Sequence, residues 1–315
     1  MAADRADHRV LVTGAAGFVG SRLMQRLKQT PATVIGLIGP NGTNDPVAVD
    51  LTDAPALARI IADFRPTTVI HLAAMSSVGD GSVTPDTVWT VNFDGTRALA
   101  EAMRALPDPS RLIFASSAEV YGRQFNAGPR DETSALSPAS PYARTKAACE
   151  YLLADMASEA LSVVVLRLFN HTGPGQDERF VAPSFAAQIA RVLRDGGDEI
   201  QVGNLDAVRD FSDVDDVIEA YVAVIEDAAP ASPFDVYNVG SGRPVAIRTI
   251  LDALVEQSGR SIKAVPAPNR MRASDVPRAE GVFDKFRDRY GWSATTPLQA
   301  TAAAVLKHEI GRHSA

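Results

Sequence analysis

Tyr142 and Lys146 have the residue types and the spacing for acid–base chemistry. They are four residues apart in a predicted helix, 142–158, so their side chains lie on the same face. A free phenol has a pKa of about 10, which makes it a poor proton relay at neutral pH. A nearby ammonium stabilises the phenolate and lowers that pKa. The pair therefore predicts a phenol that exchanges a proton with a carbonyl or hydroxyl while a cofactor exchanges a hydride. An ordinary helix face is the alternative, because lysine is a common residue.

A glycine-rich turn near the start of the chain indicates where that cofactor binds. A short apolar strand, 9–12, is followed by Gly14, Gly17 and Gly20 and then by an amphipathic helix to about residue 29. Missing side chains at such a turn let a pyrophosphate approach backbone N–H groups at the helix N-terminus. The spacing is G-x-x-G-x-x-G rather than the commoner G-x-G-x-x-G. We predict dinucleotide binding here rather than a simple tight turn.

The next two strands bear on the choice of cofactor. Strand 33–38 ends at Gly39 and Pro40, without the Asp or Glu that would hydrogen-bond the adenosine ribose and favour NAD. No arginine follows to bind a 2′-phosphate. The choice between NAD(H) and NADP(H) stays open, and the missing carboxylate favours NADP(H). Asp50, at the end of strand 47–51, could touch the adenine.

Two further strands bring small and hydroxylic residues to the edge of the predicted sheet where ligands bind. Strand 68–74 contains His71, which we interpret as a core histidine, and its small C-terminal residues leave room for a nucleotide. Strand 111–117 places Ser117 at the same edge, where its hydroxyl could hold a substrate oxygen. Asn92, in a predicted helix 86–106, either braces the site through backbone groups or packs. We interpret Asp53 as the N-cap of the helix that follows it.

Composition limits the classes of protein. The chain has 315 residues, 46% hydrophobic and 22% charged, and a net charge of −7, which argues against nucleic-acid binding. No apolar run reaches membrane-spanning length, and no secretory signal precedes the first strand. The only cysteine, Cys149, cannot form an internal disulfide, so we expect a reducing, cytoplasmic location. We assign no metal ligand.

Strands and helices alternate from residue 9 to 169, which predicts an α/β fold with a parallel sheet covered on both faces. We expect a Rossmann-type doubly wound sheet with a smaller C-terminal lid that binds substrate. The predicted dinucleotide-binding domain comprises residues 1–170 and 212–240. The predicted substrate domain comprises residues 171–211 and 241–315.

The motifs resemble those of the extended short-chain dehydrogenase/reductase superfamily over nearly the whole chain. The resemblance rests on Thr13-Gly14-x-x-Gly17-x-x-Gly20, His71-Leu72-Ala73-Ala74, the segment 116–122 and Ser140-Pro141-Tyr142-x-x-x-Lys146. It implies an enzyme with Ser117, Tyr142 and Lys146 as catalytic residues. The cofactor contacts that it implies are Gly14, Gly17, Phe18, Val19, Gly20, Asp50, Leu51, Leu72, Ala73, Ala74, Tyr142, Lys146, Phe169 and His171. Many nucleotide-sugar epimerases, dehydratases and reductases share these motifs, so they indicate the class and not the substrate.

The second half of the chain resembles the GDP-mannose branch of that superfamily, in segments 167–176, 203–211 and 271–277. The resemblance implies a GDP-sugar substrate, contacted by Asn170, Val181, Arg209, Arg272 and Asp275. Guanidinium forks suit a diphosphate, and a carboxylate such as Asp275 suits the N1–H and N2–H donors of guanine. The alternative for Arg209 is an ion pair with a neighbouring aspartate on a solvated loop.

Within this branch two reactions compete. A dehydratase needs a base beside the phenol, and Glu119 stands where the branch places one. A reductase transfers one hydride to a C4 ketone, with Tyr142 as proton donor. Ser117 in place of the usual threonine, Gly39-Pro40 in place of an arginine-rich loop and Val208 in place of a lysine favour the reductase. We therefore expect reduction of GDP-4-keto-6-deoxy-mannose to GDP-rhamnose, with GDP-mannose 4,6-dehydration as the alternative.

Two other classes stay in view. A UDP-sugar or TDP-sugar epimerase would share the front half but lack the patterns at 170–176 and 203–211. A non-catalytic cofactor sensor would tolerate the loss of Tyr142 or Lys146, and both are present. The predicted helices 86–106 and 142–158 resemble the pair through which this superfamily dimerises, so we expect a homodimer.

Overall fold

The structure is a computed structural model that describes residues 8–40, 47–75, 84–227, 232–270 and 276–314. The chain divides by its contacts into two compact units. The first comprises Met1–Gly122, Ala135–Leu168 and Tyr221–Asn238, and the second comprises Arg123–Ser134, Phe169–Ala220 and Val239–Ala315. That one domain binds the dinucleotide and the other binds the substrate stays a prediction. Arg272 and Asp275, two predicted substrate contacts, lie outside the described residues.

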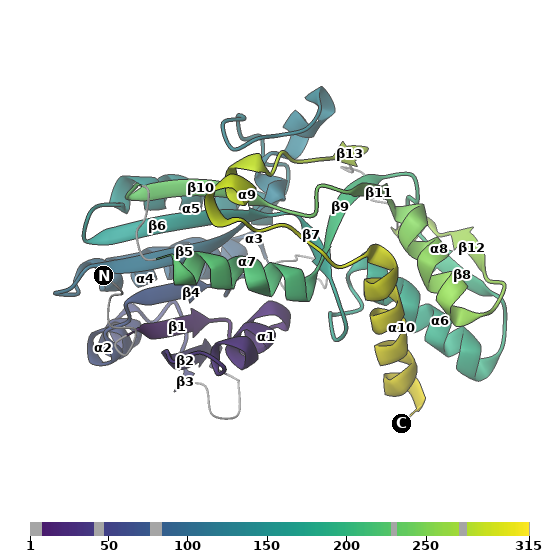
Figure 1. The fold of residues 1–315 in the computed structure, drawn as a ribbon, viewed down its shortest axis with the longest axis horizontal. Helices are drawn as coiled ribbons and strands as arrows, with labels where there is room; N and C mark the ends of the chain where they lie inside the picture. The colour runs from purple at the N-terminus through teal and green to yellow at the C-terminus, as the bar shows by residue number, and fades with distance from the viewer. Residues whose placement is uncertain (1–7, 41–46, 76–83, 228–231, 271–275, 315) are drawn as a thin grey trace. The chain divides into compact units, whose positions relative to one another are not determined.

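A seven-stranded sheet forms the frame of the first unit, in the order β10-β6-β5-β4-β1-β2-β3 (Figure 1). The strands are β1 (Arg9–Thr13), β2 (Thr33–Ile38), β3 (Val47–Ala48), β4 (Thr68–His71), β5 (Ser110–Ser117), β6 (Leu161–Leu168) and β10 (Phe234–Val239). Neighbours from β3 to β6 pair in parallel. The order of the strands reverses between β1 and β4, the place where doubly wound sheets bind ligands. The predicted Rossmann-type fold is confirmed.

Helices cover both faces of this sheet. They are α1 (Phe18–Leu27), α2 (Ala54–Phe64), α3 (Pro85–Trp89), α4 (Gly95–Arg104), α5 (Pro141–Met156) and the last residues of α7 (Val214–Glu226). One core lies under α2, α4 and α5, where Leu57, Leu99 and Leu153 pack with Leu11 and Leu112 of the strands. Figure 1 shows α1 and α7 on the near face and α4 and α5 on the far face. Burial on both faces explains why these strands read as continuous apolar runs.

The structure corrects three predicted elements. The expected helix 86–106 is interrupted by a π-helical turn, η2 (Thr90–Asp94), between α3 and α4. The expected strand 47–51 stops at Ala48, and the carboxylate of Asp50 accepts a hydrogen bond from the Thr52 amide at 2.9 Å, which forms a turn instead. The expected strand 68–74 stops at His71.

The second unit is built around β9 (Val208–Asp213). It pairs with β7 (Asn170–Thr172), β11 (Pro244–Ala246) and β13 (Arg278–Ala279), while β8 (Glu199–Val202) pairs with β12 (Lys263–Pro266). Its helices are α6 (Val181–Asp195), α8 (Ile247–Ser258), α9 (Asp284–Tyr290) and α10 (Leu298–Ser314). A separate apolar core joins α6, α8 and α10, with Phe185, Leu254 and Leu306 among its buried members.

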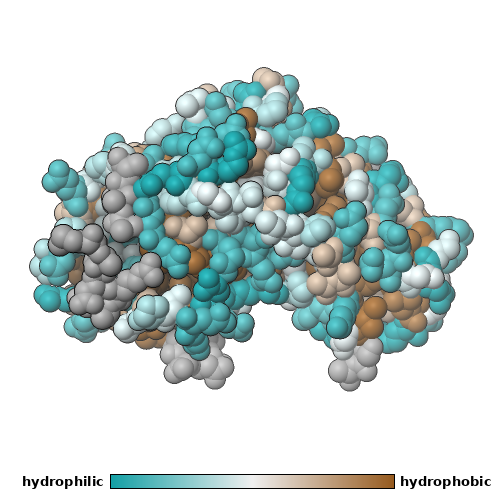
Figure 2. Space-filling model, viewed as in Figure 1, coloured by the Kyte–Doolittle hydropathy of each residue, from teal (hydrophilic) through white to brown (hydrophobic). Residues whose placement is uncertain are grey.

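The face of the molecule drawn in Figure 2 is mostly polar. Figure 2 shows hydrophilic residues over most of the viewed face, with small apolar patches between them. Over the described ranges, no helix is both long enough and apolar enough to cross a lipid bilayer.

Candidate active site

The glycine turn packs β1 and β4 against the start of α1. Gly14 has φ +69°, and a Cβ there would lie 2.9 Å from the backbone nitrogen of Ala73. A Cβ on Gly20 would lie 2.1 Å from the carbonyl oxygen of Gly14, so no larger residue fits. Gly17 is the N-cap of α1 and has no capping side chain. Phe18 and Val19 follow in the first helical turn. This cradle of bare backbone fits a dinucleotide pyrophosphate.

The predicted nucleotide contacts lie close to the carboxyl ends of the strands. Leu72, Ala73 and Ala74 directly follow β4, and the Ala73 amide donates to the Thr13 hydroxyl at the end of β1, at 3.2 Å. Asp50 is exposed after β3, and hydrogen bonds from Thr52 hold the pKa of its carboxyl below the usual value. Leu51 is buried in the core under α4. Their contacts with a cofactor stay predictions.

Two side chains near this edge, His71 and Asp53, have structural roles. His71 is buried and bonds Thr13 through Nδ1 at 2.7 Å and Thr96 through Nε2 at 2.9 Å. Burial, and then the charge of Lys146, lower its pKa to about 3, so the interpretation as a neutral core histidine is confirmed. Asp53 caps α2 through the Ala56 amide at 3.0 Å, also as predicted.

Asn92 braces the site. Its Oδ1 accepts from the Met75 amide at 2.7 Å, and its Nδ2 donates to the Met75 carbonyl at 3.2 Å and to the Thr145 hydroxyl at 3.0 Å. Thr145 directly precedes Lys146. Asn92 therefore ties the segment after β4 to the helix that carries the predicted catalytic pair, from within the π-helical turn. Such turns are frequent at functional sites.

The predicted catalytic residues come together at the carboxyl end of β5. Ser117 is the last residue of that strand, and Tyr142 lies in the first turn of α5, which begins with Ser140 as N-cap and Pro141. A hydrogen bond joins the side chains of Ser117 and Tyr142. The ammonium of Lys146 donates to the Ala115 carbonyl at 2.7 Å and lies 5.9 Å from the ring centroid of Tyr142.

The electrostatics of Tyr142 differ from the prediction. Burial raises the pKa of Tyr142, the charge of Glu119 raises it further, and the hydrogen bond with Ser117 lowers it. The predicted lowering of this pKa by Lys146 is wrong for the protein as it stands, because the ammonium points at the backbone of β5. Tyr142 is therefore a protonated phenol at neutral pH, which suits it to donate a proton.

Lys146 is buried among apolar and charged neighbours. Burial lowers its pKa to about 8, although Cys149 and Glu150 oppose the shift. Its ammonium lies 4.6 Å from the ring centroid of Phe114, a cation–π distance. The lysine consequently holds its proton at neutral pH and releases it in mild alkali. Cys149 is buried.

Glu119 stands beside this group, in the 3₁₀ turn η3 (Ala118–Val120). Its Oε2 accepts from the Ser140 hydroxyl at 3.3 Å, and its charge acts on Tyr142. The carboxylate is exposed. A second acid–base group is therefore available next to the phenol.

The remaining predicted contacts belong to the second unit. Phe169 is buried, and the His171 ring bonds its carbonyl at 3.3 Å. Asn170 is exposed in β7 and pairs with Phe211 of β9, two residues after Arg209, so both polar side chains lie on one face of these strands. Arg209 donates to the Val208 carbonyl at 2.8 Å. Val181 is the first residue of α6.

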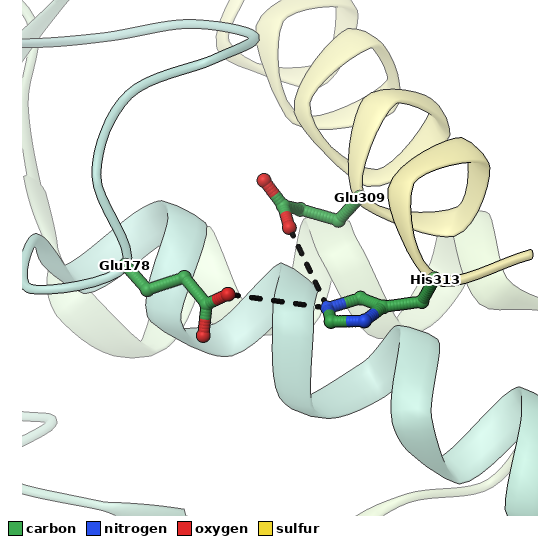
Figure 3. Close-up of side chains that lie close together, drawn as sticks. All are labelled: Glu178, Glu309 and His313. Carbon is green, nitrogen blue, oxygen red and sulfur yellow. Dashed lines mark ion pairs between the residues drawn. The ribbon is translucent and has the colours of Figure 1, made fainter. Parts of the chain in front are cut away.

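One further group of ligand-type side chains lies in the second unit. Glu178, Glu309 and His313 bring their ligand atoms within 4.8 Å of one another (Figure 3). Both carboxylates also meet guanidinium groups: Arg191 contacts Glu178 at 2.5 Å, and Arg312 contacts Glu309 at 3.1 Å. These cations balance the carboxylates, so we interpret the group as an ionic clamp between the last turns of α10 and the segment before α6.

Comparisons with known proteins agree with this geometry. Residues 10–240 match the model of the NAD dependent epimerase/dehydratase family. The chain is 33% identical to the GDP-6-deoxy-D-mannose reductase of Pseudomonas aeruginosa, over 95% of this chain and 96% of that protein.

Solved structures give the same family and two kinds of relative. RMD from Pseudomonas aeruginosa complexed with NADPH has a TM-score of 0.84 at 31% identity, covering 97% of this chain and 99% of that one. The UDP-glucose 4-epimerase of Thermus thermophilus, in complex with NAD, has a TM-score of 0.82 at 32% identity, covering 96% and 99%. Reductases and epimerases thus lie at similar distance. The chain belongs to the NAD dependent epimerase/dehydratase family, and it is an NAD(P)-dependent enzyme of the nucleotide-sugar class.

Proposed function

We propose that this enzyme reduces the C4 ketone of GDP-4-keto-6-deoxy-mannose to GDP-rhamnose with NADPH. The observation that carries the proposal is the hydrogen-bonded Ser117–Tyr142 pair at the end of β5, with Tyr142 kept protonated by burial. A ketone reduction needs a proton donor at that place, whereas an oxidation of the sugar begins with a base.

The steps follow from the positions of three side chains. When bound, NADPH supplies the hydride that reduces the carbonyl carbon. The Ser117 hydroxyl holds the carbonyl oxygen. The Tyr142 O–H bond breaks, and its proton joins the developing alkoxide. Lys146, charged at neutral pH, would have to turn its ammonium from the Ala115 carbonyl toward Tyr142 to stabilise the phenolate that remains.

The substrate assignment is supported by the relative of known activity and by the second unit. The Pseudomonas aeruginosa protein whose name states GDP-6-deoxy-D-mannose reductase aligns with nearly the full chain. Asn170 and Arg209 share one face of β7 and β9 and would contact the diphosphate. Arg272 and Asp275 would add a second guanidinium and a carboxylate for the guanine, and Val181 would pack against the nucleotide.

Two assays test the proposal. Purified enzyme is given GDP-4-keto-6-deoxy-mannose with NADPH, and separately GDP-mannose with NADP⁺. We expect net NADPH consumption with the ketone and no ketone from GDP-mannose. Tyr142→Phe should lower kcat roughly 10²–10⁴-fold and leave NADPH affinity unchanged, because it removes the proton and not the ring. Ketone formation from GDP-mannose without net NADPH change would instead establish the dehydratase.

Two alternatives each have an observation in their favour. Glu119 lies close enough to Tyr142 to change its pKa, which favours a dehydratase that uses this carboxylate as base. The similarity to UDP-glucose 4-epimerases favours C4 epimerisation with a retained cofactor. UDP-glucose is therefore added to the assays, and its conversion to UDP-galactose without net change in NADH would overturn the reductase proposal.

We also propose that the enzyme is a homodimer through the surface formed by α3, α4 and α5. Tyr151 of α5 is 66% exposed and Trp89 of α3 is 38% exposed, which is unusual for large aromatic side chains. Tyr151→Glu should convert a dimer to a monomer in light scattering. A monomeric wild-type protein would contradict the proposal.

A further inference from the structure

A buried network of polar side chains lies next to the predicted catalytic residues in the sequence and in the fold. Glu150 of α5 and Arg167 of β6 form an ion pair, with Nη2 to Oε2 at 2.7 Å and Nε within 3.2 Å of both carboxylate oxygens. The Ser116 hydroxyl donates to the same carboxylate. Arg167 also donates to the Tyr121 hydroxyl at 2.9 Å, and that hydroxyl donates to Asn238 at 2.7 Å. All five side chains are buried.

The network contacts both ends of segment 116–121, which carries the predicted catalytic residues Ser117 and Glu119. Ser116 comes directly before Ser117, and Tyr121 follows two residues after Glu119. Both ends of this short segment are thus bonded to the same guanidinium–carboxylate pair. Backbone pairing adds to the restraint, because Ser116 is opposite Arg167 in the register of β5 and β6.

The same pair also acts on the helix that carries Tyr142 and Lys146. Glu150 is four residues after Lys146, on the same face of α5. The negative charge of Glu150 favours the ammonium form of Lys146, against the burial that disfavours it. The other titratable groups around Lys146 are Tyr142 and Cys149 on α5 and His71 on β4, while Arg167 of β6 pairs with Glu150. His71 is neutral, so Cys149 and Glu150 are the groups that favour the ammonium, and Arg167 acts through its pair with Glu150.

We propose that Glu150 and Arg167 are positioning residues of this active site: they fix the segment with Ser117 and Glu119 against α5, and they hold a carboxylate one helical turn from Lys146. The proposal deepens the function proposed above and rests on the same catalytic group. It needs no particular sugar substrate, because the network touches only the chain's own catalytic elements.

Removing the negative charge of Glu150 and, separately, the positive charge of Arg167 tests the proposal most directly. The titration midpoint of Lys146 is measured by NMR on protein with lysine labelled at Cε, assigned with Lys146→Arg. We expect a midpoint of about 8 in the wild type. Glu150→Gln should lower it by about one pH unit, because a carboxylate that favours the ammonium is gone. Arg167→Met should raise it, because the Glu150 charge is then no longer balanced by a guanidinium. A purely structural role would loosen the packing in both variants and move both midpoints up toward 10.5.

Arg167→Met leaves an unpaired buried carboxylate and can fail to fold. The double variant Glu150→Gln/Arg167→Met removes both charges, and its midpoint should lie between those of the wild type and Glu150→Gln. Glu150→Gln alone decides the point: an unchanged or higher midpoint overturns the proposal. The titration needs no substrate, so it can be interpreted even if the reductase assay is negative.

A matched pair of serines tests the positioning role. Ser116→Ala removes one hydrogen bond to Glu150 at the carboxyl end of β5. Ser110→Ala removes a buried hydroxyl, at the other end of the same strand, that has no hydrogen-bond partner among the described residues. On whichever nucleotide sugar the wild type converts, we expect Ser116→Ala to lower kcat about ten-fold with little change in KM, and Ser110→Ala to leave both within two-fold. Equal kcat values in the two variants would overturn the positioning role.

Discussion

The two units each contain an ion pair between a glutamate and an arginine, and the two pairs differ in how far they are exposed to solvent. Glu150 and Arg167 in the first unit expose 4% and 6% of their side chains. Glu178 and Arg191 in the second unit expose 32% and 43%. In the first unit, further hydrogen bonds from Ser116 and to Tyr121 accompany the ion pair. Burial therefore comes with a complete set of partners, which a solvated pair does not need.

This difference in burial goes with a difference in what the two ion pairs join. The buried pair joins β6 to the helix and the strand that carry predicted catalytic residues, where exact geometry matters. The solvated pair joins α6 to the segment just before it, where water can replace any lost partner. A buried pair is costly to break and a solvated one is not, so the comparison can be tested by removing one partner from each.

Arg167→Met should give the largest loss of stability. The variant leaves the Glu150 carboxylate buried without its cation, and breaking such a pair costs about 3–5 kcal/mol of unfolding free energy. Arg191→Met in the second unit is the matched control and should cost about 1 kcal/mol or less. Urea denaturation of both variants at neutral pH measures the difference. Similar losses would show that burial does not separate the two pairs.

The sequence predicted those parts of the first unit that depend on local patterns. Gly14, Gly17 and Gly20 marked the turn, and the alternation of strands and helices gave the doubly wound sheet. Asp53 marked the start of the helix that follows it. These signals are short-range, because spacing and capping act within one or two turns.

Contacts between residues far apart in the chain could not be predicted from the sequence. Nothing local shows that Lys146 would bond the Ala115 carbonyl, 31 positions away, so the predicted effect on the Tyr142 pKa had the wrong sign. The π-helical turn at Asn92 depends on its bonds to Met75 and Thr145. Glu150 was missed as well, although a glutamate one turn after a predicted catalytic lysine is a usable signal. Contacts of Arg272 and Asp275 stay predictions.

Lys146→Met should stabilise the enzyme while abolishing its activity. The pKa of Lys146 falls to about 8 in the fold from 10.5 outside it, so the unfolded chain binds more protons between these values. Stability from this group therefore rises as the pH rises from about 8 to 10.5, and at pH 7 the buried charge is a cost. After allowance for the bond lost at Ala115, we expect a gain of about 1–2 kcal/mol at pH 7.

Urea denaturation at pH 7 and pH 10 checks this expectation. The difference between wild type and variant should shrink at the higher pH, because the wild-type lysine is then neutral in the fold. Lys307→Met, an exposed position on α10, is the control and should show no such pH dependence. A Lys146→Met variant less stable than wild type at pH 7 would mean that the Glu150 charge already balances the burial of the lysine.

Added salt should have the smallest effect on the free energy of unfolding, and it distinguishes the solvated Glu178–Arg191 pair from the buried Glu150–Arg167 pair most directly. Glu178→Gln removes a pair that water and ions reach, so its cost of about 0–1 kcal/mol should fade as NaCl rises from 0.05 to 1 M, where the Debye length falls to about 3 Å. The cost of Glu150→Gln should change little over the same range, because ions cannot approach a buried pair. Equal salt dependence in both variants would mean that water reaches the Glu150–Arg167 pair, and the distinction between a buried pair and the solvated Glu178–Arg191 pair would fail.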